Sequence, residues 1–583
     1  MQYPLELFKE EVIDIIRKYF QDTGYKKIEI RLETPPEELG DLALPCFQFA
    51  PLLKKKPEDI ADLIKKEIKK DLEEKIKDTK WIKKIEKKGA YLNFFIREEM
   101  LVKETINTIL KMRENYGKLE RKNKKVIIEH TSANPNGPLH VGRARNPIIG
   151  DSLVRIYKAC GYDVESQFYV DNIGKQVAIL AWGVNNIDAK KVPQPRYDKA
   201  DHKLVGFYQI AYRQMEEKPN VKKEIDEIVK KCEHGDKETI SMMKNIANKA
   251  LEGIKESLGQ INITIDRYVP ESNFIEDGSC EKVISQLRKT KYAGTEGNAV
   301  YLDLKDFGIK GRDTRFFITR KDGTSLYATR DIAYHIWKSK QADMLINVLG
   351  EDHKLEARQV EIALKLLNIK NIPKVVFYAF VSLPQGRMST RRGRVVYLDD
   401  LINEGLARAY EEVRKRREGE LTREKMEEIA RKVGIGAIRY NIVKIQPEKE
   451  IVFKWEDALD FEGDSAPFIQ YAHARANSIL KKAGRIEENF DPTVVRHPSE
   501  IRLVKILAKL PSKLKTACET CRPNIIANFA YEIAVRFNEF YRDCRVIGSE
   551  KKLEKARLLI VKATKIVLKN VLDLIGIEAP EEM

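Results

Sequence analysis

Short apolar runs alternate with stretches of helical periodicity through the middle of the chain. The runs lie at residues 126–129, 164–170, 299–303, 344–349 and 375–380. Strands that alternate with helices are typical of a parallel sheet covered by helices, so the pattern predicts an α/β domain. Between about 185 and 265 the pattern becomes polar and helical, which predicts a helical insertion in that domain.

The pattern of hydrophobic and polar residues differs at the two ends of the chain. Residues 4–20 and 57–77 have the periodicity of amphipathic helices and 89–96 that of a strand, which together predict a small α+β module. From about 400 onward almost every segment has helical period, which predicts a helical bundle. We expect residues 460–583 to hold a core of their own, so that their removal leaves the sheet domain folded.

The fold class that we predict is therefore multidomain: an N-terminal α+β module, a Rossmann-type parallel-sheet domain and a C-terminal all-α bundle. The length of 583 residues agrees with several cores, because single cores stop growing near ~250–300 residues. The expected parts are 1–118, 119–400 with the insertion at about 185–265, a helical connection at 401–459, and a bundle at 460–583.

The net charge of the chain bears on the kind of partner that it binds. The chain has 106 Lys and Arg against 89 Asp and Glu, a formal net charge of +17. Such a surplus favours a polyanionic partner, because each neutralised phosphate releases counterions. A lysine-rich surface of a heat-stable protein gives the same surplus, so charge alone leaves the two interpretations about even.

Seven cysteines are too few for a disulfide framework, so a reducing cytoplasm is expected. For Cys518, Cys521 and Cys544 we expect buried thiols rather than a zinc site, since no fourth ligand stands nearby. The segment MQYPLELFKEE has no apolar core, and no apolar run approaches the ~18 residues that span a bilayer. We therefore expect no signal peptide and no membrane partner.

The strongest local pattern is IIEHTSANPNGPLHVGRARNPIIGD at 127–151. A buried strand ends at Glu129, a turn rich in Ser, Asn, Pro and Gly follows, and a helix then runs to about Cys160. Such a junction at the carboxyl edge of a parallel sheet is where these folds bind nucleotides. His140 can donate to an oxyanion there. Pro147 leaves two alternatives open: a helix capped by Asn146, or a helix from about 141 with a kink.

Five segments, in order along the chain, resemble one family. HVGR (140–143) is similar to the His-Ile-Gly-His motif of class I aminoacyl-tRNA synthetases, and EHTSANPNGPLHVG (129–142) resembles the arginine-specific members. The other segments are SLYATRDIAYHIW (325–337), GRMSTRRGRVVYLDDLI (386–402), DFEGDSAPFIQYAHAR (460–475) and VLDLIGIEAPEEM (571–583). They resemble the family's arginine-pocket helix, its second ATP-binding loop, the start of its tRNA-binding bundle and its C-terminus.

The resemblance implies an arginine–tRNA ligase with an assigned role for each matching residue. The arginine site would comprise Glu129, Ser132, Asn134, Glu271, Tyr327, Asp331 and His353. The ATP site would comprise His140, Gly142, Arg143, Gly350, Met388 and Ser389, of which His140 and Arg143, together with Arg391, would stabilise charge during catalysis. The residues assigned to tRNA are Asn93, Tyr541 and Met583. We expect removal of residues 460–583 to abolish tRNA binding.

The chemistry of the pocket residues agrees with that substrate. The guanidinium of arginine is planar, always charged and carries five donors, so its pocket needs fixed carboxylates. Tyr327 and Asp331 are spaced i, i+4 and share one helix face. Without the family match, a surface Asp beside a packed Tyr would be the better interpretation.

The reaction implied by the resemblance needs no protein nucleophile. Arginine attacks the α-phosphorus of ATP, and the terminal adenosine of tRNA then attacks the mixed anhydride, so catalysis is positioning and charge stabilisation. Magnesium would arrive with ATP, and no metal held by the protein is expected. We expect a cytoplasmic monomer whose partners are ATP, arginine and the tRNA for arginine.

Two departures from the family keep alternatives open. Arg143 stands where the motif ends in His, and neither 134–139 nor the second loop at 386–392 contains a lysine. Arg391 and Arg392 would supply the missing charge. A class I synthetase for another amino acid and an RNA-binding paralogue with a dead site are the competing hypotheses.

Overall fold

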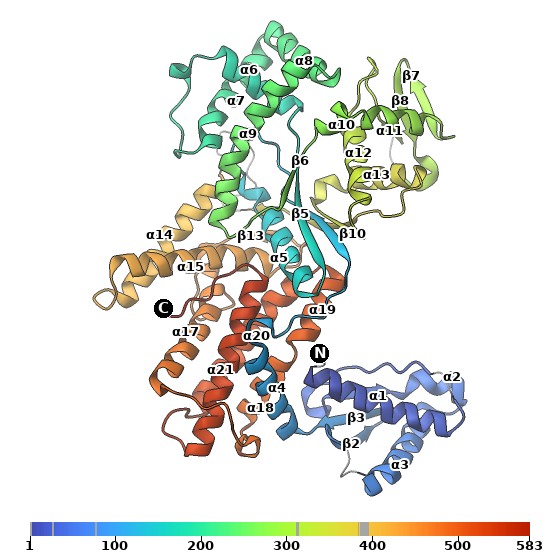
Figure 1. The fold of residues 1–583 in the computed structure, drawn as a ribbon, viewed down its shortest axis with the longest axis vertical. Coiled ribbons are helices and arrows are strands. Elements are labelled where there is room, and N and C mark those ends of the chain that lie inside the picture. The colour runs from blue at the N-terminus through green and yellow to red at the C-terminus, as the bar shows by residue number, and fades with distance from the viewer. Residues whose placement is uncertain (1–2, 26–27, 76–78, 311–313, 383, 385–395) are drawn as a thin grey trace.

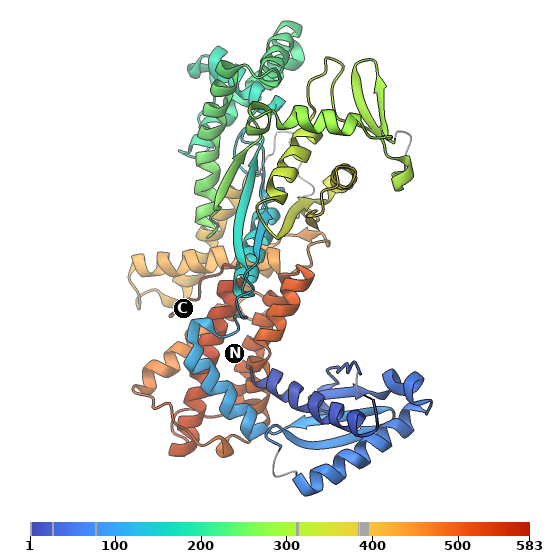
Figure 2. The same ribbon diagram turned by 45° about the vertical axis from the view of Figure 1, so that its right-hand side comes forward.

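The protein is described by a computed structural model that covers residues 3–25, 28–75, 79–310, 314–382, 384 and 396–583 (Figures 1 and 2). Its centre is a parallel sheet in the strand order β11–β10–β4–β5–β6. The strands are β4 (Lys125–Glu129), β5 (Asp163–Val170), β6 (Arg267–Pro270), β10 (Met344–Gly350) and β11 (Lys374–Tyr378). All four neighbouring pairs run parallel, which confirms the predicted α/β sheet.

One predicted strand belongs to another sheet. The run at 299–303 forms β8 (Ala299–Asp303), which pairs antiparallel with β7 (Ala293–Glu296) and β9 (Arg315–Phe317) in a separate sheet. The prediction was wrong because an apolar run does not encode strand direction. The fifth parallel strand is instead β6, whose four residues RYVP are too short to carry a periodic signal.

The insertion between β5 and β6 is helical, as predicted. It contains α6 (Lys175–Asn186), α7 (Ala200–Glu217), α8 (Pro219–Glu233) and α9 (Lys237–Gln260). These helices pack on one another beyond one end of the sheet, on the side opposite to the bundle (Figure 1). α10 (Asn273–Glu276), α11 (Ser279–Arg288), α12 (Tyr327–Ser339) and α13 (Lys354–Leu366) follow, with α12 and α13 beside the sheet.

The N-terminal module has the predicted α+β composition. An antiparallel sheet in the order β1–β3–β2 packs against two long helices. Its elements are α1 (Pro4–Asp22), β1 (Leu42–Pro45), α2 (Ala50–Leu53), α3 (Pro57–Lys75), β2 (Ile82–Lys88) and β3 (Tyr91–Ile96). The next helix, α4 (Glu98–Met112), packs on α18 (Pro498–Ala508) and α21 (Lys551–Leu574) of the C-terminal bundle, so the module joins the bundle before residue 118 (Figure 2).

The C-terminal part is helical throughout, apart from the two-residue strand β13 (Ile451–Val452), which pairs with β12 (Val381–Ser382). Its helices are α14 (Leu398–Arg417), α15 (Arg423–Val443), α16 (Trp455–Ala458), α17 (Ala466–Ala483), α18 (Pro498–Ala508), α19 (Leu510–Thr520), α20 (Asn524–Asp543) and α21 (Lys551–Leu574).

The helices of the bundle pack mainly on one another, since α21 contacts α17 and α20, and α18 contacts α20. That the bundle can be removed without unfolding the sheet domain stays a prediction. α5 (Arg145–Ala159), the helix that follows the ATP-type motif, contacts β4, β5 and β10 with one side and α15, α19 and α21 with another. One continuous apolar core therefore runs from the N-terminal module through the sheet to α21. The sequence did not predict that α5 links the sheet to the bundle, because periodicity identifies the apolar face of each helix but not the element that covers it.

Within the described residues, no helix combines the length and the apolar composition needed to cross a bilayer. All seven cysteines are buried.

Candidate nucleotide and amino-acid site

The ATP-type motif folds as a short turn before a helix. A 3-10 turn spans Val141–Arg143, and α5 begins at Arg145. Pro147 lies in the first turn of α5, where backbone N–H groups have no helical partner in any case. Asn146 does not cap the helix: its side chain accepts from the backbone N of Thr131 at 2.7 Å and donates to the carbonyl of Val348 at 2.9 Å. α5 therefore begins at Arg145, two residues ahead of Pro147, which neither sequence alternative gave: Asn146 is not the cap, and residues 141–143 form a separate 3-10 turn.

His140 is fixed in one protonation form by its own turn. Its Nδ1 accepts a hydrogen bond from the backbone N of Gly142 at 3.1 Å. Burial and the nearby Arg143 lower the pKa of the imidazole, so the ring is neutral. A neutral ring that accepts at Nδ1 carries its proton at Nε2. Nε2 is buried and has no protein partner within the described residues, so it is a donor available to a ligand.

The other residues of the predicted ATP site surround this turn. Gly142 packs so tightly that an added Cβ would lie 3.1 Å from His140 Nδ1, and Cβ at Gly350 would lie 2.4 Å from Asp352 Oδ1. In both places the absence of a side chain on the glycine leaves room for a neighbouring side chain of the protein itself. Arg143 is exposed at the end of the turn. Met388, Ser389 and Arg391 lie outside the described residues.

A cluster of acidic side chains lies where β5, β6 and α12 meet. Glu271, just after β6, is 2% exposed, and its Oε1 accepts from Arg330 Nε at 2.8 Å. Its Oε2 has no donor among the residues described, and the hydroxyl of Tyr169 is likewise buried without a partner. Asp171 and Asp331 lie close enough to raise the pKa of Tyr169, after burial itself.

Glu271 shares its cation with other carboxyl groups. Asp171 and Glu271 both lie near the guanidinium of Arg330, which is also 3.6 Å from Glu233, and Glu233 pairs in turn with Arg320. Burial, only partly offset by Arg330, raises the pKa of Glu271 well above its usual range. A second cation placed beside Glu271 Oε2 would restore its ionisation, and a buried carboxylate requires such a partner.

Tyr327 and Asp331 lie on one face of α12, as predicted. The Tyr327 hydroxyl accepts from the backbone N of Lys175 at 3.1 Å, and its half-exposed ring lies over Arg330. Asp331 lies 3.1 Å from His335 Nδ1. Burial opposes ionisation of Asp331, but His335 outweighs it and keeps its pKa below the usual range. Asp331 is therefore a fixed anion at the rim of the cluster.

Glu129 has partners inside the protein. It ends β4, is 5% exposed, and accepts from Lys338 Nζ at 2.6 Å and from Ser132 Oγ at 3.1 Å. Ser132 Oγ also accepts from the backbone N of Tyr169. The roles of Glu129 and Ser132 visible in the structure are thus to join β4 to β5 and α12. Asn134 is half-buried in the turn that follows.

His353 lies in the short turn Glu351–His353 after β10. Its Nδ1 lies 3.0 Å from Glu356 and its Nε2 3.7 Å from Asp352, and the hydrogen bond with Glu356 raises its pKa. A cavity of about 570 Å³ borders this edge of the sheet, and Glu129, Asp331, His335 and Asn347 are in its lining.

The predicted tRNA residues lie in two other regions. Tyr541 on α20 is 46% exposed, and the guanidinium of Arg475 lies between its ring and that of Tyr471, at 4.9 Å and 4.7 Å. Phe537 and Phe540 on the same helix are fully buried and belong to the core. Met583 packs on the hairpin of α14 and α15.

Asn93 is 4% exposed in β3 of the N-terminal module, so little of its side chain is accessible. Exposed aromatic rings of Phe47 and Tyr91 lie edge to face in the same module.

Three residues around the site were not predicted: Tyr169, Arg330 and Lys338. A signal for Lys338 existed, because Asp331, His335 and Lys338 follow the i, i+4, i+7 spacing of one helix face. Asp171, which lies near Glu271 and Arg330, was not assigned a role from the sequence either. The position of Tyr169 depends on the pairing of β5 with β4 and β6, which local pattern does not give.

Comparison with known proteins agrees with this geometry. Residues 105–455 match the model of the catalytic domain of class I (R) tRNA synthetases. Flanking matches are the arginyl tRNA synthetase N-terminal domain at 6–96 and the DALR anticodon binding domain at 469–583. The parallel sheet, the His140 turn and these matches define a class I tRNA synthetase.

Relatives along the whole chain make the assignment specific. An arginine–tRNA ligase of Methanocella arvoryzae is 45% identical over 574 residues, which cover 98% of this chain and 99% of that protein. One of Methanothermobacter thermautotrophicus is 42% identical over 579 residues, 99% of each chain. The arginyl-tRNA synthetase of Thermus thermophilus has a TM-score of 0.82 at 26% identity, covering 98% of this chain and all of that one. The chain belongs to the arginyl-tRNA synthetase family.

Proposed function

We propose that the described site carries out the reaction of this family: it activates arginine with ATP and transfers it to the terminal adenosine of a tRNA for arginine. The observation that carries the proposal is the acidic cluster with two buried oxygen atoms, Glu271 Oε2 and Tyr169 Oη, that lack a protein partner among the described residues. Such a cluster fits a substrate that is cationic and rich in donors.

Arginine meets both requirements. Its guanidinium can donate to Glu271 Oε2 and to Asp331, and it supplies the second positive charge that the cluster needs. Tyr327 would border the alkyl part of the substrate from the same face of α12. Glu129, Ser132 and Asn134 would serve the amino-acid end, with Lys338 holding Glu129 in place. His353 stays a proposed neighbour of this site.

The ATP phosphates fit the turn before α5. His140 Nε2–H is a buried donor aimed away from its own backbone partner, and the helix N-terminus favours an anion. Arg143, exposed beside it, can bind phosphate oxygens, and Gly142 and Gly350 would lie along the nucleotide. Met388 and Ser389 are proposed to bind ATP, and Arg391 to stabilise charge during catalysis. Magnesium would be held mainly by the phosphates and water.

The tRNA would contact the bundle and the N-terminal module. A half-exposed Tyr541 beside Arg475 and Tyr471 suits an unstacked base, because aromatic rings and guanidinium planes both stack on bases. Met583 and Asn93 are further proposed contacts. We also propose that the chain acts as a cytoplasmic monomer, with the anticodon read by residues 460–583.

The test is the variant Asp331→Asn, assayed by arginine-dependent ATP–pyrophosphate exchange in the presence of tRNA. An amide cannot match a permanent cation, and loss of a charged partner in a closed site costs roughly 3–5 kcal/mol. We expect kcat/KM for arginine to fall by about 100-fold or more while the protein stays folded. Asp198→Asn is the matched control, because Asp198 is exposed and pairs with Lys203 on the surface.

Three outcomes would change the assignment. A change of less than about threefold would place the pocket elsewhere. If the unmodified protein binds tRNA but shows no exchange, this result would instead favour the hypothesis of an RNA-binding paralogue with a dead site, which Arg143 kept as an alternative. Exchange that responds to a different amino acid would favour a synthetase of another specificity.

A further inference from the structure

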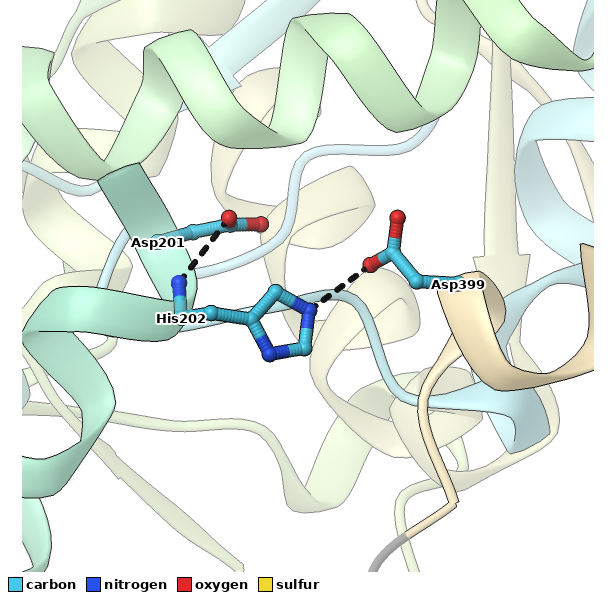
Figure 3. Close-up of side chains that lie close together, drawn as sticks. All are labelled: Asp201, His202 and Asp399. Carbon is cyan, nitrogen blue, oxygen red and sulfur yellow. Dashed lines mark hydrogen bonds and ion pairs between the residues drawn. The ribbon is translucent and has the colours of Figure 1, made fainter. Parts of the chain in front are cut away.

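A buried ionic cluster connects the insertion to the first turn of α14. Asp399, 2% exposed, is held on both oxygens, and Lys199 Nζ is 2.6 Å from its Oδ1. His202 Nε2 is 3.1 Å from its Oδ2 (Figure 3). Ser257 Oγ, from the end of α9, donates to Oδ1 at 2.9 Å. Asp201 is fully buried, and its Oδ1 accepts from the backbone N of His202.

This cluster has the ligand types of a metal site, but it already contains its cation. Asp201, His202 and Asp399 each offer a ligand atom, and these atoms lie within 4.8 Å of one another. The ammonium of Lys199 is 2.6 Å from Asp399 and 3.8 Å from Asp201 Oδ2. A divalent ion placed there would face a buried positive charge at short range, which a low-dielectric interior does not screen. The cluster is therefore a buried ionic contact between the insertion and α14, in which Lys199 supplies the positive charge.

The next carboxylate of α14 is held by the same part of the insertion. Asp400 Oδ2 is 2.5 Å from Arg196 Nη1, and Oδ1 accepts from the hydroxyl of Tyr197 at 2.8 Å. Asp400 also accepts from the backbone N of Tyr397, which closes the start of the helix. Two successive acidic side chains thus fix the first turn of α14 to residues 196–202.

The first turn of α14 in turn supports the ATP-type motif. The backbone N of Leu398 donates to the carbonyl of Leu139 at 2.7 Å, and that of Val141 donates to the carbonyl of Val396 at 3.0 Å. These bonds pair Tyr397 with His140 in an antiparallel bridge. The ring of Tyr397 also lies edge to face with that of His202, at 5.2 Å and 83°. An unbroken path of contacts therefore leads from Lys199 through Asp399 and Tyr397 to His140.

We propose that Lys199 is a positioning residue for the ATP site, and that one function of the insertion is to hold the first turn of α14 against the His140 turn. This rests on the proposed ATP role of His140. Without the ammonium, Asp399 and Asp201 are left as two buried carboxyl groups without a cation, which strongly disfavours the present packing. The first turn of α14 and the bridge to His140 then lose their fixed position.

The experiment compares Lys199→Met, Lys199→Arg and Lys203→Met in the full-length protein. Lys203 is the matched control, since it lies on the same helix, is exposed and pairs with Asp198. Pyrophosphate exchange with saturating tRNA is measured with ATP and arginine varied separately, and thermal melting checks the fold. For Lys199→Met we expect kcat to fall by about tenfold or more and the KM for ATP to rise, because misplaced charge-stabilising groups slow phosphoryl chemistry.

The readouts separate positioning from general damage. The KM for arginine should stay within about twofold, and Lys199→Arg should recover part of kcat. Ser257→Ala, which removes one donor and keeps the charges, should give a smaller change in the same direction. The proposal is overturned if folded Lys199→Met and Ser257→Ala both keep kcat and the KM for ATP, or if arginine and ATP are affected equally. Absence of exchange in the unmodified protein would reject the proposed function rather than the positioning role of Lys199.

Discussion

At the scale of single residues, Arg143 bears on how this chain supplies positive charge at the ATP phosphates. It is exposed one residue beyond Gly142, and its charge contributes to lowering the pKa of His140 and opposes the rise of that of His353. An arginine is always charged and can bind two phosphate oxygens at once, whereas a histidine there would be mostly neutral at pH 7. Arg143 can thus offset lysines that the family's loops usually carry.

We expect Arg143→Ala to lower kcat of pyrophosphate exchange by about 10²-fold or more, as for loss of a transition-state donor. The KM for arginine should change little, because the acidic cluster is untouched. Arg143→His should recover part of the loss. Arg423→Ala on the exposed side of α15 is the control. Near-normal exchange combined with lost tRNA charging would show that Arg143 serves RNA.

How far the sequence predicts the site depends on the kind of residue. Glu271, Asp331 and His140 were predicted because a motif places them and their chemistry suits the substrate. The protonation form of His140 follows only from the turn that directs Gly142 N–H onto Nδ1. The partner of Glu271 could not be predicted, because Arg330 reaches it across 59 residues of sequence.

At the scale of elements, the local sequence pattern predicted whether a segment is a helix or a strand better than it predicted which other segments it packs against. β8 was predicted as a strand and is one, but it pairs with β7 through a hairpin at Gly297, whose φ is +60°. The dipeptide Gly297–Asn298 between the two strands was the available turn signal. Strand pairing in the central sheet joins residues 126 and 344, and such distant contacts leave no local trace.

The pair of helices α17 and α20 gives an element-scale prediction for tRNA. Arg475 donates to Asn538 at 2.6 Å, which fixes its guanidinium between Tyr471 and Tyr541. Base stacking on an aromatic ring is worth ~1–3 kcal/mol, so Tyr541→Ala should raise the KM for tRNA by about 5- to 100-fold at unchanged kcat. Tyr541→Phe keeps the ring and is the matched variant. A KM for tRNA that stays within twofold in Tyr541→Ala would remove Tyr541 from the tRNA surface.

At the scale of the whole molecule, α5 links the sheet domain to the bundle, because nearly all of its side chains are buried and it contacts elements of both parts. Buried polar contacts reinforce the apolar ones. Arg439 on α15 is fully buried and donates to Asp151 on α5, to the carbonyl of Ile261 before β6 and to that of Ile575 after α21. Its guanidinium thus joins three parts of the chain that are far apart in sequence.

This packing also gives a physical reason for a glycine near the C-terminus. Gly576 has φ of +69°, and an added Cβ would lie about 2.1 Å from Arg439 Nη2. Only glycine allows both the backbone conformation and the close approach of the guanidinium. The segment VLDLIGIEAPEEM, which resembled the family's C-terminus, therefore closes around a side chain of α15.

We expect Arg439→Met to lower the free energy of unfolding of the whole chain by roughly 3–5 kcal/mol, because it leaves Asp151 and two carbonyl groups short of a buried donor. Sheet domain and bundle should still unfold together, since they share one apolar core. Arg431→Met on the same helix is the control: Arg431 is half-exposed, pairs with Glu578, and should contribute less than about 1 kcal/mol. The measurement is chemical denaturation followed by circular dichroism and by tryptophan fluorescence. Two separate transitions in the unmodified protein, or equal effects of the two variants, would contradict a single unit tied together at Arg439.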